Sequence, residues 1–263
     1  MTLNMQGKNG IEWCDATWNP VAGCHHGCRW VMPDGTTAIC YAETIAEGMA
    51  KGAYAEGFSH HYWKPQLLNS PQKKKEPLKI FVGSMADLFG HWVKDEQIEA
   101  ILRVARECPQ HTFQLLTKNP KRTVKFDLPR NVWVGASMPP DVMMGGQLSQ
   151  QQKERMLHVT LESLAGVQAA VKWISFEPLS WDVSPIVAKY DNVLLWAVIG
   201  AASAGRKYFA PDAGHFRALQ DVLDVQEVAT FYKGNLRSLA EAKANWREEY
   251  PRPSMVEEIG DLL

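Results

Sequence analysis

The chain has 263 residues, of which 46% are hydrophobic and 22% are charged. This length allows one large buried core, and the composition is typical of a soluble globular protein. The formal net charge of −1 argues against a protein that coats duplex DNA non-specifically, because such binding depends on a positive excess, but it is compatible with a local basic patch. The sequence has no apolar signal region at its amino terminus and no apolar run of membrane-spanning length, so we expect a cytoplasmic protein without a membrane partner.

Seven short segments along the chain are predicted to form strands. They are rich in branched, aromatic and leucine side chains without strict alternation, which is typical of strands covered on both faces. In chain order they are residues 11–17, 78–83, 112–116, 131–136, 171–176, 193–200 and 228–232.

Helices are predicted between these strands, because apolar residues recur at helical spacing in residues 40–50, 95–107, 151–164 and 213–223. Alternation of strands and helices implies an α/β fold with a mostly parallel sheet and right-handed crossovers. Six or seven such strands favour a partial or complete barrel, although periodicity does not separate a barrel from a doubly wound open sheet. We expect a single domain over residues 1–263, with a surface extension from about residue 245.

A cluster of three cysteines is the strongest chemical signal in the sequence. Cys24, Cys28 and Cys40 follow the first predicted strand with the spacing C-x3-C-x11-C, and Gly23 and Gly27 give their loop backbone freedom. In a reducing compartment such a cluster is more typical of metal binding than of disulfides. Three thiolates leave one position of a cubane iron–sulfur cluster without a protein ligand, and that open position can bind a substrate or cofactor.

The cysteine spacing by itself leaves a second metal open. A structural zinc site would use the same three thiolates and either His25 or His26 as the fourth ligand. The chain would then be a zinc-stabilised binding module without catalysis, or a metal-dependent hydrolase. Cys14 and Cys108 lie in a predicted strand and at a predicted helix end, where cysteine is usually a small buried hydrophobe.

Several motifs resemble those of a phage-associated family related to the radical SAM superfamily, named for S-adenosylmethionine (SAM). They run in order from residue 11 to about residue 234, and together they are more specific than the cysteines alone. The motifs are IEWCDATWNPVAGC with the later CYAE, then FVGSMADLF, LLTKNP, NVWVGAS and SFEPL.

This resemblance implies a partial (β/α)6-type barrel of the radical SAM kind, whose first loop binds a four-iron four-sulfur cluster on Cys24, Cys28 and Cys40. SAM would bind the open iron, and its one-electron cleavage would give a 5′-deoxyadenosyl radical that abstracts hydrogen from the substrate. The implied partner is an electron donor of the flavodoxin or ferredoxin type. The implied substrate is a phage nucleobase, in DNA or as a nucleotide, or its amino-acid adduct on a hypermodified pyrimidine. The resemblance therefore implies that this chain is an isomerase or other modifying enzyme, acting on that substrate in the host cytoplasm.

The chain departs from the family pattern at two points. Eleven residues separate Cys28 from Cys40, where the common superfamily spacing has two, and we expect the excess to loop out at the turn sequence Pro-Asp-Gly of residues 33–35. Related proteins carry Gly-Gly-Glu-Ser after the sixth strand, whereas residues 200–203 read Gly-Ala-Ala-Ser. The missing acid implies an altered substrate pocket.

Polar residues at the ends of the predicted strands are the remaining candidate site residues, because chemistry in an α/β barrel lies at the carboxyl ends of its strands. They are Ser84, Asp87, Thr117, Lys118, Ser137, Glu177 and Gly200. As cofactor-binding residues, Ser84 or Asp87 would meet the amino group of SAM. Lys118 and Ser137 would meet its carboxylate. Capping of the following helices explains Ser84, Asp87 and Ser137 equally well.

Glu177 is the candidate catalytic residue as well as a candidate cofactor ligand. An acid between apolar neighbours at a strand end is costly unless it is paired, which favours a functional role. We expect it to contact either a ribose hydroxyl or the substrate.

The size of the substrate stays open at this point. Two basic runs, residues 73–75 and 118–125, and two irregular segments, residues 52–77 and 138–146, would suit contact with the phosphates of DNA from which one base is extracted. The near-neutral net charge instead favours a free nucleotide. The sequence does not fix the oligomeric state.

Overall fold

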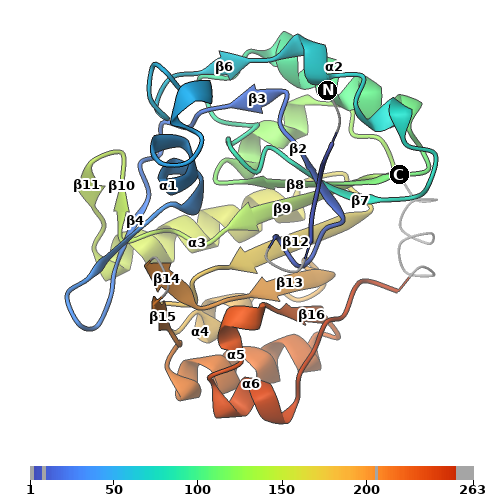
Figure 1. The fold of residues 1–263 in the computed structure, drawn as a ribbon. Coiled ribbons are helices and arrows are strands. Elements are labelled where there is room, and N and C mark those ends of the chain that lie inside the picture. The colour runs from blue at the N-terminus through green and yellow to red at the C-terminus, as the bar shows by residue number, and fades with distance from the viewer. Residues whose placement is uncertain (1–2, 8–9, 205–206, 253–263) are drawn as a thin grey trace.

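The chain forms a curved, mostly parallel sheet with helices on its outer face (Figure 1). This computed structural model describes residues 3–7, 10–204 and 207–252. A short strand, β1 (Asn4–Met5), pairs antiparallel with the first of seven parallel strands. These are β2 (Ala16–Trp18), β7 (Lys79–Val82), β8 (Thr112–Thr117), β9 (Val132–Ser137), β12 (Val171–Phe176), β13 (Trp196–Ile199) and β16 (Ala229–Tyr232).

The order of the strands decides between the two architectures that the sequence left open. From β2 to β16, each parallel strand pairs with the one before it in the chain order, without a reversal. A doubly wound sheet reverses its strand order at a switch point, so this sheet winds in one direction as a partial barrel. Its two edges approach each other where the Gly234 N–H donates to the Glu12 carboxylate at 2.7 Å.

The helices pack their apolar faces against this sheet. Ile98, Ile101 and Leu102 of α2 are buried in the main hydrophobic core, while α3 begins at a capping box between Ser149 and Gln152. The α-helices are α1 (Tyr41–Glu47), α2 (Asp95–Glu107), α3 (Gln150–Ala165), α4 (Ser184–Val187), α5 (Ala213–Val225) and α6 (Ala240–Ala244). Short 3-10 helices are η1 (Lys51–Ala53), η2 (Pro65–Leu67), η3 (Pro71–Lys73), η4 (Pro120–Lys125) and η5 (Gly234–Leu236).

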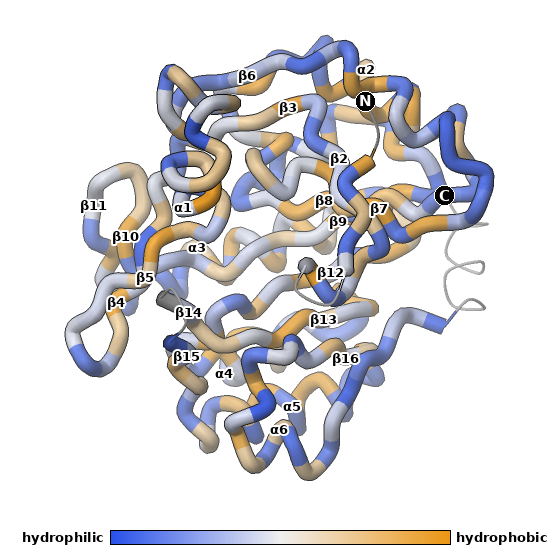
Figure 2. The backbone as a smooth tube through the Cα atoms, viewed as in Figure 1, coloured by the Kyte–Doolittle hydropathy of each residue, from blue (hydrophilic) through white to orange (hydrophobic). Residues whose placement is uncertain are grey.

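Aromatic side chains fill the interior of the barrel. Trp13, Trp173 and Trp196 lie with ring centroids 4.8 to 5.9 Å apart and are almost completely buried. Gly135 makes room for them, because a Cβ at this position would lie 2.2 Å from Cε2 of Trp173. Figure 2 shows hydrophobic stretches along β7 and β13, two strands of this sheet. The barrel is therefore a packed core over this part of its length.

Short strands that the sequence did not predict gather at one side of the molecule, where Figure 1 shows β4, β10, β11, β14 and β15. Strands of two or three residues carry too few side chains to show a periodicity. Hairpin β4 (Arg29–Val31) and β5 (Thr37–Ile39) joins hairpin β10 (Val142–Met143) and β11 (Gly146–Gln147) in a four-stranded sheet. Strand β14 (Ala202–Ala204) pairs with β15 (Lys207–Phe209), and β3 (Val21–Ala22) pairs with β6 (Tyr62–Trp63).

The first predicted strand is wrong over residues 11–15, and β2 starts only at Ala16. The Cys14 N–H bonds to the Ile11 carbonyl at 3.4 Å and closes a turn, which directs Glu12 toward Gly234. A tertiary contact thus overrides the local strand propensity of this segment.

The segment predicted to extend from about residue 245 lies against β16. The Tyr232 N–H donates to the Arg247 carbonyl at 2.8 Å, and the Glu249 N–H donates to the Thr230 carbonyl at 3.0 Å. Nε1 of Trp196 donates to the Glu249 carbonyl at 2.9 Å. The segment therefore covers the otherwise open edge of the sheet.

In the part of the chain that the structure describes, no helix combines the length and the apolar character that a membrane span requires.

Candidate active site

A cavity of about 220 Å³ opens at the carboxyl ends of the barrel strands. Cys40, Lys118, Ser137 and Glu177 line it, so four of the predicted site residues meet at one place although they follow different elements. The predicted site residues outside its lining are Cys24, Cys28, Ser84, Asp87, Thr117 and Gly200.

The cysteine loop is held close to the backbone of residues 58–60. Gly23 has a φ of +86°, and a Cβ there would lie 1.7 Å from the His60 carbonyl oxygen. Only glycine fits this approach. The Gly23 N–H donates to the Met85 carbonyl and the Cys24 N–H to the Phe58 carbonyl, each at 2.9 Å. These bonds fix Cys24 beside the end of β7.

The β4–β5 hairpin explains the unusual spacing of the second and third cysteines. The chain leaves Cys28 along β4, turns at residues 33–35 as expected, and returns along β5 to Cys40. The Cys40 N–H donates to the Cys28 carbonyl at 3.3 Å. Arg29 donates to both carboxylate oxygens of Glu43, at 2.6 and 2.7 Å, and to the Cys28 carbonyl at 2.9 Å. Eleven residues of sequence thus separate two cysteines that are neighbours at the base of a hairpin.

The three predicted ligand thiols share one electrostatic neighbourhood. Burial raises the pKa of both Cys24 and Cys28, and the nearby Cys40 thiol adds to each rise. The ammonium of Lys118 opposes the rise at Cys28. Because burial disfavours thiolates, these groups need a positive charge beside them in order to ionise. Among the described residues, no three His, Cys, Asp or Glu side chains are drawn together tightly enough to hold a single metal ion.

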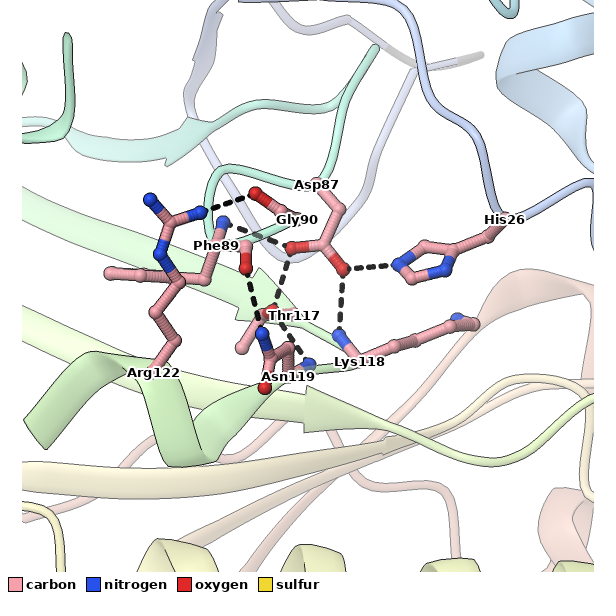
Figure 3. A network of polar contacts seen from close by, with 8 residues as sticks. All are labelled: His26, Asp87, Phe89, Gly90, Thr117, Lys118, Asn119 and Arg122. Atoms are coloured by element: carbon pink, nitrogen blue, oxygen red, sulfur yellow. Dashed lines mark hydrogen bonds and ion pairs between the residues drawn. The ribbon is translucent and has the colours of Figure 1, made fainter. Parts of the chain in front are cut away.

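A buried carboxylate ties the cysteine loop to the barrel (Figure 3). Oδ1 of Asp87 accepts hydrogen bonds from the Phe89 N–H at 3.1 Å and the Thr117 hydroxyl at 2.6 Å. Oδ2 accepts the Lys118 N–H at 2.8 Å and lies 2.8 Å from Nε2 of His26. Burial would raise the pKa of Asp87, but His26 and the other donors hold it below its ordinary value. Asp87 therefore joins the cysteine loop to the ends of β7 and β8.

The side chains of three predicted site residues form hydrogen bonds to other groups of the protein. A carboxylate offers about four accepting positions, and Asp87 fills them all with protein donors. The Thr117 hydroxyl donates to Asp87 and accepts the Asn119 N–H at 2.9 Å. The Ser84 hydroxyl pairs with the Asn19 side chain at 3.0 Å. These residues shape the wall behind the cavity.

Glu177 forms an ion pair that the sequence did not predict. Its Oε1 lies 2.7 Å from Nζ of Lys233, and its Oε2 accepts the Ser175 hydroxyl at 2.9 Å. Burial disfavours the charged form of Lys233, but the Glu177 carboxylate outweighs this effect and raises the pKa of the lysine. Gly200 leaves room for the pair, because a Cβ there would lie 3.0 Å from Cγ of Glu177 and 3.2 Å from Cδ of Lys233.

Lys118 extends into the cavity from the Asp87 network. Its backbone N–H is fixed by Asp87, and its side chain lines the cavity together with Ser137. Over the described residues, its ammonium has no hydrogen bond or ion pair of its own. An ammonium in this state is suited to an anionic group of a ligand.

Two hairpins form the roof of the cavity. Trp30, Ala38 and Ala202 line it from above, and Ala38 and Ala202 also pack with Met32 in a small hydrophobic core. Asp34 at the turn of the β4–β5 hairpin forms an ion pair with Lys207 of β15. The inserted residues therefore build part of the cavity rather than a free loop.

The two basic runs do not meet at the cavity. Residues 73–75 lie near the amino ends of β7 and β8, since the Lys74 carbonyl accepts the Gln110 amide at 3.1 Å and the Leu78 carbonyl accepts the Thr112 N–H. Arg122 donates to the carbonyls of Gly90 and Val93 and pairs with Asp95. Of the two runs, only Lys118 lines the cavity.

The comparison with protein families is decisive for classification. A family described as a protein of unknown function, DUF5131, matches residues 8–248. The chain belongs to this family. No curated protein is detectably similar to it in sequence.

The DUF5131 chain is similar in fold to spore photoproduct lyase. A structure of that lyase complexed with dinucleoside spore photoproduct has a TM-score of 0.58 and 9% sequence identity, covering 87% of this chain and 80% of the lyase. A mutant of the lyase gives a TM-score of 0.57 at 9% identity, over 87% and 79% of the two chains. Another mutant, with bound AdoMet and the dinucleoside photoproduct, gives 0.50 at 10% identity, over 83% and 64%. The partial barrel of this DUF5131 protein therefore shares the fold of that lyase.

Sequence reasoning missed Lys233 and Ser175 in this DUF5131 protein. A signal for Lys233 was present, because it follows the last barrel strand directly, as Lys118 follows β8. Ser175 lies two residues before Glu177, and alternation along a strand places both on the same face. Their contact with each other and with Lys233 required the folded barrel.

Proposed function

We propose that this protein is a radical SAM enzyme that holds a four-iron four-sulfur cluster on Cys24, Cys28 and Cys40. One observation carries the proposal: a partial barrel with the fold of spore photoproduct lyase, as the radical SAM resemblance implies, has one cavity that Cys40, Lys118, Ser137 and Glu177 line. The alternative is zinc on the same three thiolates with His25 or His26 as the fourth ligand, since the Asp87 contact to Nε2 of His26 leaves Nδ1 of that ring available.

The residues present fit such a cluster and its cofactor. Three thiols supply the ligands that iron–sulfur clusters require, and they leave one iron for SAM. When bound, the cluster and SAM supply reductive cleavage of a carbon–sulfur bond and abstraction of hydrogen from the substrate. Buried surroundings keep water away from that chemistry.

The side chains divide into those that touch ligands and those that position them. Lys118 binds the SAM carboxylate and Ser137 adds a hydroxyl beside it, while Glu177 contacts the substrate as the candidate catalytic residue. Ser84, Asp87 and Thr117 act behind them by fixing the cysteine loop and the Lys118 backbone. Gly200 keeps space for Glu177.

The proposed substrate is a nucleobase, as a nucleotide or in DNA, or an amino-acid adduct of one, which the enzyme isomerises or otherwise modifies. Support comes from fold-level analogy with a lyase that is described with a dinucleoside photoproduct, and from the resemblance to a phage-associated family. Because the basic runs do not surround the cavity, a free nucleotide is favoured over a polynucleotide. A flavodoxin or ferredoxin would supply the electron in the host cytoplasm.

Anaerobic reconstitution with iron and sulfide tests this function. The loaded protein is expected to contain about four iron and four sulfide per chain and to release methionine and 5′-deoxyadenosine from SAM after reduction with dithionite. Zinc as the sole bound metal, with no cleavage of SAM, would contradict the proposal. A hydrolase assay would then separate a metal-dependent hydrolase from a binding module.

A further inference from the structure

The Glu177–Lys233 ion pair lines the same cavity as Cys40 and Lys118. Both residues line the cavity, and their side chains keep 18% and 27% of their surface exposed. The charges that act on Lys233 come from Glu177, Glu12 and Tyr208. Those that act on Cys28 come from Lys118, Asp87, Arg29 and Cys40. Tyr41, which also lines the cavity, lies within the electrostatic influence of both Cys40 and Glu177. The ion pair is therefore a second polar group beside Cys40 in one cavity.

The contribution of this ion pair to the stability of the fold does not explain its presence. A partly buried ion pair costs desolvation energy that its attraction does little more than offset, so apolar residues would serve a barrel core as well or better. Three further features nonetheless hold the pair in place. They are the Ser175 hydroxyl, the space beside Gly200, and the hydrogen bond between Gly234 and Glu12 that fixes the segment after Lys233. A pair kept in place at this cost is best explained by a ligand.

The hydrogen-bonding positions that remain free define what this ligand must offer. Glu177 has about four accepting positions, of which Lys233 and Ser175 use two. Lys233 has three N–H donors, of which Glu177 uses one. Accepting positions on Glu177 and N–H donors on Lys233 thus remain next to each other, on two groups whose Oε1 and Nζ atoms lie 2.7 Å apart. The pair as a whole is neutral, which favours an uncharged group with a donor next to an acceptor.

The remaining walls of the cavity suit a flat ring. Trp13 and Phe81 lie on one side with Leu116, and Trp30 lies on the hairpin roof. Aromatic rings stack on the π faces of nucleobases, and aliphatic side chains pack against the same faces.

We infer that Glu177 and Lys233 recognise the amide edge of the substrate's base, where a ring N–H lies beside a carbonyl as in uracil or thymine. Glu177 accepts the ring N–H, and Lys233 donates to the carbonyl oxygen. This inference rests on the proposed function and adds to it the class of base.

Discrimination between two nucleotides tests the inference. Binding of thymidine 5′-monophosphate and of its N3-methyl analogue is measured by calorimetry on the protein before and after reconstitution with iron and sulfide. The wild type is expected to prefer the unmethylated nucleotide by at least about fivefold, since a bidentate contact to a base edge discriminates by about 1–3 kcal/mol. The double variant Glu177→Leu/Lys233→Met removes both charges and both hydrogen-bonding groups together, and its preference is expected to fall below about threefold.

Two further variants guard against a general loss of structure. Gly200→Ala keeps both charged side chains but adds a Cβ close to each of them, which displaces them. This variant is therefore expected to lose the preference as well. Arg106→Gln removes an exposed ion pair with Asp127 and is expected to keep it. Thermal unfolding and iron content are recorded for every variant.

The inference is overturned by equal preference in wild type and double variant, or by absence of thymidine monophosphate binding to the wild type. Weaker SAM binding in the double variant with unchanged nucleotide binding would assign the pair to the cofactor and also overturn it. Iron, sulfide and SAM cleavage in the wild type are separate measurements. Their failure would count against the proposed function and leave the nucleotide result to be judged independently.

Discussion

The two halves of the barrel interior differ sharply in chemistry, and strand β12 crosses from one to the other. Val171 and Trp173 of β12 belong to the buried aromatic cluster, whereas Ser175 and Glu177, which directly follows the strand, line the cavity. Val171, Trp173 and Ser175 lie on the same face, because side chains alternate along a strand. The same strand therefore supplies packing in its first half and polar contacts at its end.

The difference shows how one sheet separates stability from chemistry. In the aromatic half, burial of indole rings removes large apolar surfaces from water and contributes to the free energy of folding. In the polar half, Glu177 is paired with Lys233 and Asp87 with His26, whereas the ammonium of Lys118 has no ion pair among the described residues and is available to a ligand. Substitutions in the aromatic half are expected to lower the free energy of unfolding, whereas substitutions in the polar half are expected to weaken cluster or cofactor binding.

The largest expected effect is the loss of the cluster when a ligand cysteine is removed. Alanine at Cys24, Cys28 or Cys40 is expected to abolish the brown chromophore and most bound iron, because two thiolates do not hold a cubane. Alanine at Cys14 or Cys108, which are buried away from the cavity lining, should leave iron content unchanged. Full iron content in the Cys40→Ala protein would remove Cys40 from the ligand set.

Truncation in the aromatic half should mainly affect folding. Trp173→Ala is expected to lower the free energy of unfolding by about 3–5 kcal/mol, because it leaves a cavity among packed rings. Ser137→Ala, at the polar end of the neighbouring strand β9, should change it by less than about 1 kcal/mol. Urea unfolding of both variants measures the difference. Comparable losses would contradict the division of the barrel into two halves.

Removal of the free ammonium should affect the cofactor rather than the fold. Lys118→Ala is expected to weaken SAM binding by roughly 1.5–3 kcal/mol through loss of a charge-assisted hydrogen bond. The dissociation constant is measured with the cluster intact, and urea unfolding serves as the control. An unchanged dissociation constant would exclude Lys118 from the cofactor site.

The smallest expected effect concerns the base of the β4–β5 hairpin. Arg29→Lys keeps the positive charge but loses the two-pronged contact with Glu43, which holds Cys28 and Cys40 together. We expect this change to destabilise the arrangement of Cys28 and Cys40 by about 1 kcal/mol. The protein would then lose iron to a chelator roughly fivefold faster. Arg106→Lys, in an exposed pair, is the matched control. Equal rates of iron loss in both variants would show that the Arg29 contact does not restrain the ligands.

The sequence by itself determined the elements and many of the candidate residues. Hydrophobic patterns predicted the helix at residues 95–107 and most parallel strands to within a few residues. The rule that barrel chemistry follows strand ends then pointed to Lys118, Ser137 and Glu177, which all line the cavity. These signals are local, because each depends on residues that are neighbours in the chain.

Tertiary structure alone decided the rest, since the deciding contacts join distant residues. Glu177 meets Lys233 only after the sheet has curved, and Asp87 meets His26 only once the cysteine loop has folded back on β7. The strands around Cys28 and Cys40 are too short to show a period, so their hairpin depends on pairing with β10 and on contacts with β14. Local propensity fixes which segments are strands and helices, but the free energy of long-range contacts fixes which side chains share a site.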